Sequence, residues 1–226
     1  MRHEPVNYET IDDAELVLRA VRREAAAIRV ITTRNNQRLF RAAWGVLRNH
    51  ADAEEVVQEA YLKAFTSLEN FVGNSSLSTW LTRIVHNAAI DRQRTLKRRR
   101  ENLLEQNITM LDDPYSHFVP AQGSRTPETA LARKQFAHSL KEALADLAEE
   151  FRSVFILRVI EGMSVSETAD VLRIREATVK SRLFRTRREL RKRLEIEFEA
   201  AFSDTIPFAG VDCEAMTLRV LAALKL

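Results

Sequence analysis

The sequence has few of the residues that cross-link or interrupt a chain. It contains one cysteine, Cys213, with five glycines and five prolines among 226 residues, and aromatic residues make up only 7%. A single cysteine excludes an intrachain disulfide and is typical of proteins in a reducing cytoplasm, where we expect this protein to act. Together with 30% charged residues, this composition predicts a soluble, helical protein.

Long apolar segments are also absent. No hydrophobic run approaches the roughly 20 residues that a membrane-spanning helix needs, and the first residues are acidic and polar, unlike a signal peptide. The five histidines are scattered and match no metal-ligand spacing. We therefore expect no membrane insertion, no bound metal and no cofactor, and no constellation of residues predicts an enzyme.

Charge is present in both signs but is unevenly distributed. The net charge is only +3. Basic residues gather at positions 92–100 and 173–193, whereas acidic residues gather at positions 52–59 and 195–199. Such segregation predicts one face for a nucleic acid and another for a protein partner.

Residues 163–193 carry the clearest motif. They predict a short amphipathic helix at Val165–Leu172, a tight turn at residues 173–175 and a long basic helix from Glu176. Two helices joined by a turn of three or four residues form a helix-turn-helix unit, whose second helix enters the DNA major groove.

The second helix has two faces. Apolar residues recur at helical spacing and should pack inward: Val179, Leu183, Leu190 and Leu194. The opposite face should contact DNA through Arg175, Lys180, Ser181, Phe184, Arg185, Arg188 and Arg191. Lys180, Ser181, Phe184 and Arg185 are the residues that we expect to read bases, and the later arginines suit phosphates. A solvated basic helix is the alternative, but it does not explain an exposed Phe184.

The segment VSETADVLRIREATVKSRLFRTRREL resembles region four of bacterial extracytoplasmic-function (ECF) sigma factors, the region that reads promoters. Two positions depart from the family pattern. Arg173 stands where the family usually has a turn glycine, and a left-handed conformation there would cost about 1 kcal/mol. Ala177 stands where a glycine is common, which costs nothing inside a helix.

The segment DAEEVVQEAYLKAF, in a helix expected at residues 53–68, resembles region two of the same family. The resemblance implies that this helix docks on core RNA polymerase, through Asp52, Glu55, Gln58, Glu59, Tyr61 and Phe65. A solvated acidic face is the simpler alternative. Glu55 and Glu59 could also hold a metal with His50, but no Glu-x-x-His pair or second carboxylate helix accompanies them.

The next segment, FVGNSSLSTWLTRIVHNAAIDRQRTLKRRR, resembles the part of the family that opens the promoter. A polar loop at residues 73–76 would capture a flipped base, and a helix starting at Ser78 or Thr79 would hold the single strand. The resemblance implies downstream contacts by Asn74, Ser75, Ser76, Thr79, Trp80, Arg83, Asn87, Asp91 and Arg94. Trp80 could instead anchor the core, or serve both purposes.

Further helices are expected on both sides of these motifs. One helix is expected to open at Asp12 and Asp13 and to carry an apolar stripe from Ala14 to Ile28. A second helix is expected at residues 36–48. Asn49 and His50 indicate a turn, with Asp52 as the N-cap of the next helix.

The second half of the chain contains three more expected features. Thr126 and Pro127 indicate a helix start, and residues 151–160 predict a helix that ends before Gly162. Asp212 indicates the N-cap of a last short helix. Cys213 could sense redox state, but a lone cysteine there is more often an inert small residue.

These observations predict an all-α protein with two helical domains joined by a flexible linker. The expected boundaries are 11–100 for a region-two domain, 101–125 for the linker, 126–195 for a helix-turn-helix domain and 196–226 for a tail. The resemblance implies an ECF-type sigma factor that binds core RNA polymerase and promoter DNA and is controlled by an anti-sigma factor. The alternative is a polymerase-independent helix-turn-helix regulator, which needs neither a docking helix nor a melting loop.

Overall fold

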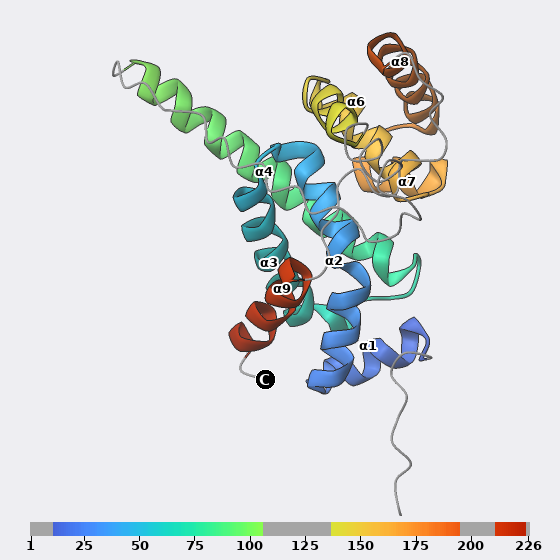
Figure 1. Ribbon diagram of the computed structural model, residues 1–226. Helices are drawn as coiled ribbons and strands as arrows, with labels where there is room; N and C mark the ends of the chain where they lie inside the picture. Colours follow the sequence, from blue (N-terminus) through green and yellow to red (C-terminus); the bar gives the residue numbers. More distant parts are fainter. Residues whose placement is uncertain (1–10, 106–136, 195–210, 225–226) are drawn as a thin grey trace, which may run out of the picture.

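A computed structural model describes residues 11–105, 137–194 and 211–224 (Figure 1). These residues form helices and contain no strand, which confirms the expected all-α class. We call residues 11–105 the N-terminal part and residues 137–194 the C-terminal part. No helix among the described residues has the length and apolarity needed to cross a membrane.

The N-terminal part is a helical bundle. It contains α1 (Asp13–Val21), α2 (Ala25–Leu47), α3 (His50–Thr66), the short 3-10 turn η1 (Leu68–Asn70) and α4 (Leu77–Glu105). Helices α2, α3 and α4 pack against one another. Their shared core includes Leu39, Phe40, Val57 and Leu81, each at most 1% exposed.

The single helix predicted from Asp12–Asp13 to Ile28 is wrong. Asp12 does cap a helix, since its carboxylate accepts from Glu15 N at 2.9 Å. The chain then breaks after α1, where Arg23 adopts a left-handed φ of 61°, and α2 begins at Ala25. Two residues of the predicted apolar stripe, Leu18 and Val21, are exposed by 56% and 43%. No glycine or proline marks this break, so hydrophobic periodicity alone could not locate it.

Two other boundaries also differ from the sequence prediction. Helix α2 is continuous from Ala25, well before the predicted start at residue 36. The N-cap of α3 is Asn49 rather than Asp52, because Asn49 Oδ1 accepts a hydrogen bond from Asp52 N at 2.9 Å. Asn and Asp cap helices equally well, so residue type did not distinguish them.

The C-terminal part carries the helix-turn-helix unit. It contains a helix at residues 137–145, α6 (Glu149–Phe155), the π-helical turn η2 (Ile156–Ile160), α7 (Val165–Leu172) and α8 (Glu176–Leu194). The predicted bounds of α7 and the turn at Gly162, with φ of 65°, are confirmed. Ser164 and Glu167 form a capping box at the start of α7.

The two parts pack against each other through α2, α4, α6 and α7. In Figure 1, α6 and α7 lie beside the upper end of α2 and the start of α4. Gly45 permits the close approach, because a Cβ there would lie 2.9 Å from Ile156 Cδ1.

Arg152, which is 2% exposed, supports the same contact. Its guanidinium donates to Gly45 O at 2.5 Å, Val46 O at 3.2 Å and Leu147 O at 2.6 Å. These include carbonyls of the last turn of α2, where a cation is favourable. Burial and the neighbouring Arg48 lower the pKa of Arg152 to about 10, so it stays charged at neutral pH.

The end of the N-terminal part and the tail add two features. Helix α4 continues to Glu105, into the segment predicted as linker, and its far end projects from the body (Figure 1). The rest of that linker and the predicted helix start at Thr126–Pro127 lie outside the described residues. The expected last helix is present as α9 (Val211–Ala223), which starts one position before Asp212 and packs on α2 and α3.

Candidate nucleic-acid and protein interfaces

The orientation of α8 follows from its buried residues. Val179 and Leu190 are both fully buried, and Leu183 is half-buried against the same core. The turn before α8 contains Arg173 with φ of 53°, and Ile174 N donates to Ala169 O at 3.1 Å to close it. Arg173 therefore adopts the left-handed conformation that is costly for a residue other than glycine, and the turn points the opposite face of α8 outward.

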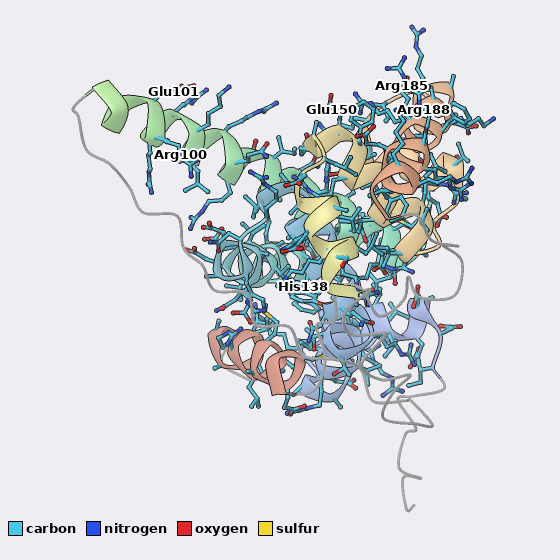
Figure 2. The ribbon with its side chains drawn as sticks, turned by 45° about the horizontal axis from the view of Figure 1, so that its top comes forward. Arg100, Glu101, His138, Glu150, Arg185 and Arg188 are labelled. Atoms are coloured by element: carbon cyan, nitrogen blue, oxygen red, sulfur yellow. The ribbon has the colours of Figure 1, made fainter. Side chains whose placement is uncertain are left out.

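That outward face carries the predicted base-reading residues. Lys180, Ser181 and Arg185 are exposed, and the Phe184 ring is 68% exposed. Figure 2 shows Arg185 and Arg188 extending from α8 away from the body. The exposed cations beside them include Arg175, Arg187, Arg191 and Lys192. A row of cations with one exposed aromatic ring can contact phosphates and base edges together.

The polar loop before α4 begins at a glycine with a left-handed backbone and ends at the N-cap of α4. Gly73 has a φ of 73°, which favours glycine. Ser76 Oγ accepts from Thr79 N at 3.1 Å and donates to Thr79 Oγ1 at 2.9 Å, so Ser76 caps α4. Asn74 and Ser76 are exposed and Ser75 is half-buried. The loop therefore presents small polar groups on a fixed helix start.

Thr79 is not available to DNA in this arrangement. It is 4% exposed, and its hydroxyl donates to Glu167 Oε1 of α7 at 2.9 Å. The hydrogen bonds from Ser164 and Thr79 lower the pKa of Glu167, so the carboxylate that accepts them stays ionised near neutral pH. A contact between Thr79 and DNA requires the two parts to separate first.

The remaining predicted melting residues follow one side of α4. Trp80 is half-buried with its ring edge-on to Phe71, at 5.5 Å between centroids, so it contributes to packing and keeps an exposed portion. Arg83 and Asn87 are half-buried, and Asp91 and Arg94 are exposed. Beyond them, residues 97–100 are four exposed cations, and Figure 2 places Arg100 on the projecting part of α4.

The predicted docking helix α3 has an acidic outer side. Glu55 and Glu59 are exposed and Gln58 is half-buried. Asp52 and Glu55 both bind Arg92 of α4, with 3.1 Å between Asp52 Oδ1 and the Arg92 guanidinium. The sequence did not reveal this pairing, because Arg92 is far from α3 in the chain.

Tyr61 is a correction to the predicted docking surface. Its ring is fully buried, and its hydroxyl donates to Thr32 O at 3.1 Å. Burial raises the pKa of Tyr61 well above 10, with a smaller contribution from nearby Cys213. Phe65 stacks on Tyr61 at 5.8 Å between centroids and is half-buried. Tyrosine is amphipathic, so its position on the helix did not show that it faces inward.

The metal alternative for α3 does not gather its ligands. His50 Nδ1 lies 3.8 Å from Glu54 Oε2, and Glu55 turns to Arg92. No group of three potential ligands comes together among the described residues.

A buried ion cluster lies between the two parts, and the sequence did not predict it. Glu161, with a side chain 7% exposed, lies 3.1 Å from the guanidinium of Arg41 and 3.4 Å from that of Arg38. Arg41 is itself only 4% exposed. Nothing in the local pattern pairs α2 with the turn after η2, so only the fold reveals this cluster.

These features define a class: a helical DNA-binding protein with a helix-turn-helix reading unit packed on a second helical bundle. Comparison with known families matches residues 31–99 to Sigma-70 region 2 and residues 137–190 to Sigma-70 region 4. The two matched segments lie in the N-terminal and C-terminal parts described above.

Curated relatives agree with this assignment. The ECF RNA polymerase sigma factor SigW of Bacillus subtilis is 31% identical over 159 residues, covering 70% of this chain and 83% of SigW. The RNA polymerase sigma-H factor of Pseudomonas aeruginosa is 29% identical, covering 81% of this chain and 94% of that protein. The chain belongs to the ECF sigma factors.

Solved structures share the fold. The sigma factor RpoE of Bartonella quintana, solved with the anti-sigma factor NepR, superposes with a TM-score of 0.55 at 24% identity, over 82% of this chain and 98% of that chain. CnrH, solved with the cytosolic domain of CnrY, has the same TM-score at 26% identity, over 81% of this chain and 97% of that chain.

Proposed function

We propose that this chain binds core RNA polymerase, directs it to promoters with an upstream and a downstream box, and helps to melt the downstream box. Family membership supports the activity. The observation that carries the promoter-reading role is the outward face of α8, where exposed cations surround a Phe184 ring that is 68% exposed.

In this proposal the C-terminal part reads the upstream box. Lys180, Ser181, Phe184 and Arg185 contact bases, because all four are exposed on the side of α8 opposite its buried apolar residues. Arg175, Arg188 and Arg191 are exposed around them and contact phosphates.

The N-terminal part binds the downstream box. Asn74, Ser75 and Ser76 receive a base that leaves the stack, since the cost of unstacking is offset by hydrogen bonds from small polar groups. Trp80 and the cations Arg83 and Arg94 hold the strand along α4, with Asn87 and Asp91 between them. Thr79 joins this surface only after its bond to Glu167 opens.

Docking on core polymerase uses the outer side of α3. Glu55, Gln58 and Glu59 form a short polar strip there, with Asp52 at its start and Phe65 at its rim. Tyr61 supports this strip from inside rather than touching the polymerase.

We also propose that an anti-sigma factor binds the chain and that the chain acts in the cytoplasm without enzymatic activity of its own. The family resemblance implies such an inhibitor, and the relative of similar fold, CnrH, was solved with a protein partner. An inhibitor that covers the exposed side of α3 or the outward face of α8 would stop initiation.

Copurification of the full chain with core polymerase tests the proposal. We expect the Gln58→Ala/Glu59→Ala variant to bind core enzyme about tenfold more weakly or worse, because two neighbouring polar contacts are lost. Lys63→Ala is the matched control, since Lys63 is exposed on the same helix. A chain that binds operator DNA but never core polymerase would instead be a polymerase-independent regulator.

A further inference from the structure

Helix α9 lies outside both segments that match the sigma-70 regions, yet it is packed on the N-terminal part. It contacts α2 and α3 together, and Figure 1 shows it lying across them. Met216, Thr217 and Val220 are fully buried in this contact. The contact therefore has an apolar centre like that of a helix bound in a groove.

Polar contacts set the register of α9 on α2. Asn36, fully buried on α2, donates from Nδ2 to Cys213 O at 2.9 Å and to Thr217 Oγ1 at 3.1 Å. The same nitrogen lies 3.2 Å from Cys213 Sγ. A buried amide that meets groups on successive turns of α9 favours one position of that helix over a sliding contact.

Ion pairs complete the contact on both neighbouring helices. Glu214 pairs with Arg29 of α2 at 2.9 Å, and Arg219 pairs with Glu54 of α3 at 3.2 Å. Both pairs are partly exposed, so they orient α9 more than they hold it.

The side of α3 that α9 covers adjoins the proposed docking strip. Glu54, which binds Arg219, is one turn before Gln58. Tyr61 lies on the same side and is near Cys213, and its stacking partner Phe65 lines a hollow that Leu224 also borders. A partner that reaches over Gln58 toward Phe65 would meet α9 in its path.

We propose that α9 obstructs the edge of the polymerase-docking face of α3, beside Gln58 and Phe65, and that the sigma factor docks fully only when α9 leaves. This inference rests on the proposed function, because it needs α3 to be the docking helix. The apparent association constant for core polymerase is then the intrinsic constant multiplied by the fraction of molecules in which α9 has left α3.

The test compares two substitutions on α9 in the full chain. Val220→Asp places a carboxylate in the buried contact and should release α9 without changing α3. Leu218→Asp is the matched control, because Leu218 is 50% exposed on the same helix. We expect the dissociation constant for immobilised core polymerase to fall about tenfold for Val220→Asp and to stay unchanged for Leu218→Asp.

A second variant works in the opposite direction. Asn36→Cys adds a thiol facing Cys213, the chain's one cysteine, so oxidation should join α9 to α2. The oxidised variant should lose core binding and regain it after reduction, whereas the wild-type chain should respond to neither treatment. Failure of the two thiols to join, measured by mass spectrometry, would contradict the position of α9.

The outcomes separate this inference from the function beneath it. If Val220→Asp binds as the wild type does, or more weakly while folded, α9 does not obstruct docking, although the loss caused by Gln58→Ala/Glu59→Ala would still support docking by α3. If no form of the chain binds core polymerase, the proposed function fails. If Val220→Asp does not fold, equal binding by oxidised and reduced Asn36→Cys overturns the inference.

Discussion

At the scale of single residues, the proposed function assigns base contacts and phosphate contacts to different residues of α8. Arg185 follows Phe184 in the sequence, is exposed and extends away from the body (Figure 2), whereas Arg191 lies near the end of the helix. We expect Arg185→Ala to lose about 1–3 kcal/mol on its preferred upstream box and to change the ranking of boxes. Arg191→Ala should weaken all sites alike and lower the salt slope by about one unit.

Binding-site selection with the full chain at two salt concentrations distinguishes the two effects. Each variant acts as the control for the other, because both replace an exposed arginine of α8 with alanine. An unchanged ranking of sites for Arg185→Ala, with only a smaller salt slope, would show that the assigned register of α8 is wrong.

His86 predicts a pH dependence of stability. It is 6% exposed in α4, and burial lowers its pKa from 6.5 to about 4. Between these values the unfolded chain binds the extra proton and the folded chain does not, so the free energy of unfolding rises with pH. The contribution is complete above about pH 6.5 and is lost as pH falls to about 4, where the loss reaches about 3 kcal/mol.

Chemical unfolding at pH 7 and pH 5 measures this effect. The two tryptophans, Trp44 and Trp80, both lie in the N-terminal part with His86, so their fluorescence reports the right region. His86→Gln should reduce the difference in the free energy of unfolding between the two pH values. His138→Gln, at an exposed position, should leave that difference unchanged. If the free energy of unfolding of His86→Gln still rises with pH as in the wild type, the pH dependence comes from another group.

At the scale of elements, the proposed function gives the loop before α4 a role in melting that is separate from upstream reading by α8. Changing Asn74, Ser75 and Ser76 to Ala should leave closed-complex formation within about twofold and impair strand opening, because the base pocket is lost while α8 is intact. Permanganate footprinting on a duplex promoter measures the opening.

A promoter with a pre-opened bubble is the control for this variant. The bubble removes the need for base capture, so it should restore initiation to near the wild-type rate. Ser76 also caps α4. The variant Ser76→Thr retains a capping hydroxyl, so it distinguishes the effect of losing the helix cap from the effect of losing the polar groups of the loop. Absence of rescue by the bubble would mean that the loop has another role.

At the scale of the whole molecule, the two parts pack closely together, and we expect this packing to oppose promoter binding by the start of α4. Thr79 is buried against α7, and Glu161 joins the C-terminal part to Arg38 and Arg41 of α2. Glu161→Ala removes both ion pairs that this carboxylate makes with Arg38 and Arg41, so separation of the two parts should become less costly.

Small-angle scattering measures that separation. The radius of gyration should increase for Glu161→Ala and stay at the wild-type value for Asp170→Ala, which removes an exposed carboxylate from α7. An unchanged radius for Glu161→Ala would mean that apolar contacts around Gly45 and Ile156 suffice to keep the parts together.

The sequence by itself determined the helical class, the bounds of α7, the tight turn before α8, the two faces of α8 and the presence of a last helix. These depend on local periodicity, capping and turn chemistry, which are written over a few neighbouring residues. The family resemblance then implied the roles of α3 and the loop before α4.

Only the tertiary structure decided which residues are covered. Tyr61 is inward because α2 and α9 close over it, and Thr79 is buried because α7 meets the start of α4. Asp52 and Glu55 form ion pairs with Arg92 from another helix. Each contact joins segments far apart in the chain, and its formation depends on how whole helices pack. Local patterns carry no information about that packing, which is why the position of α9 on the docking helix could not be read from the sequence.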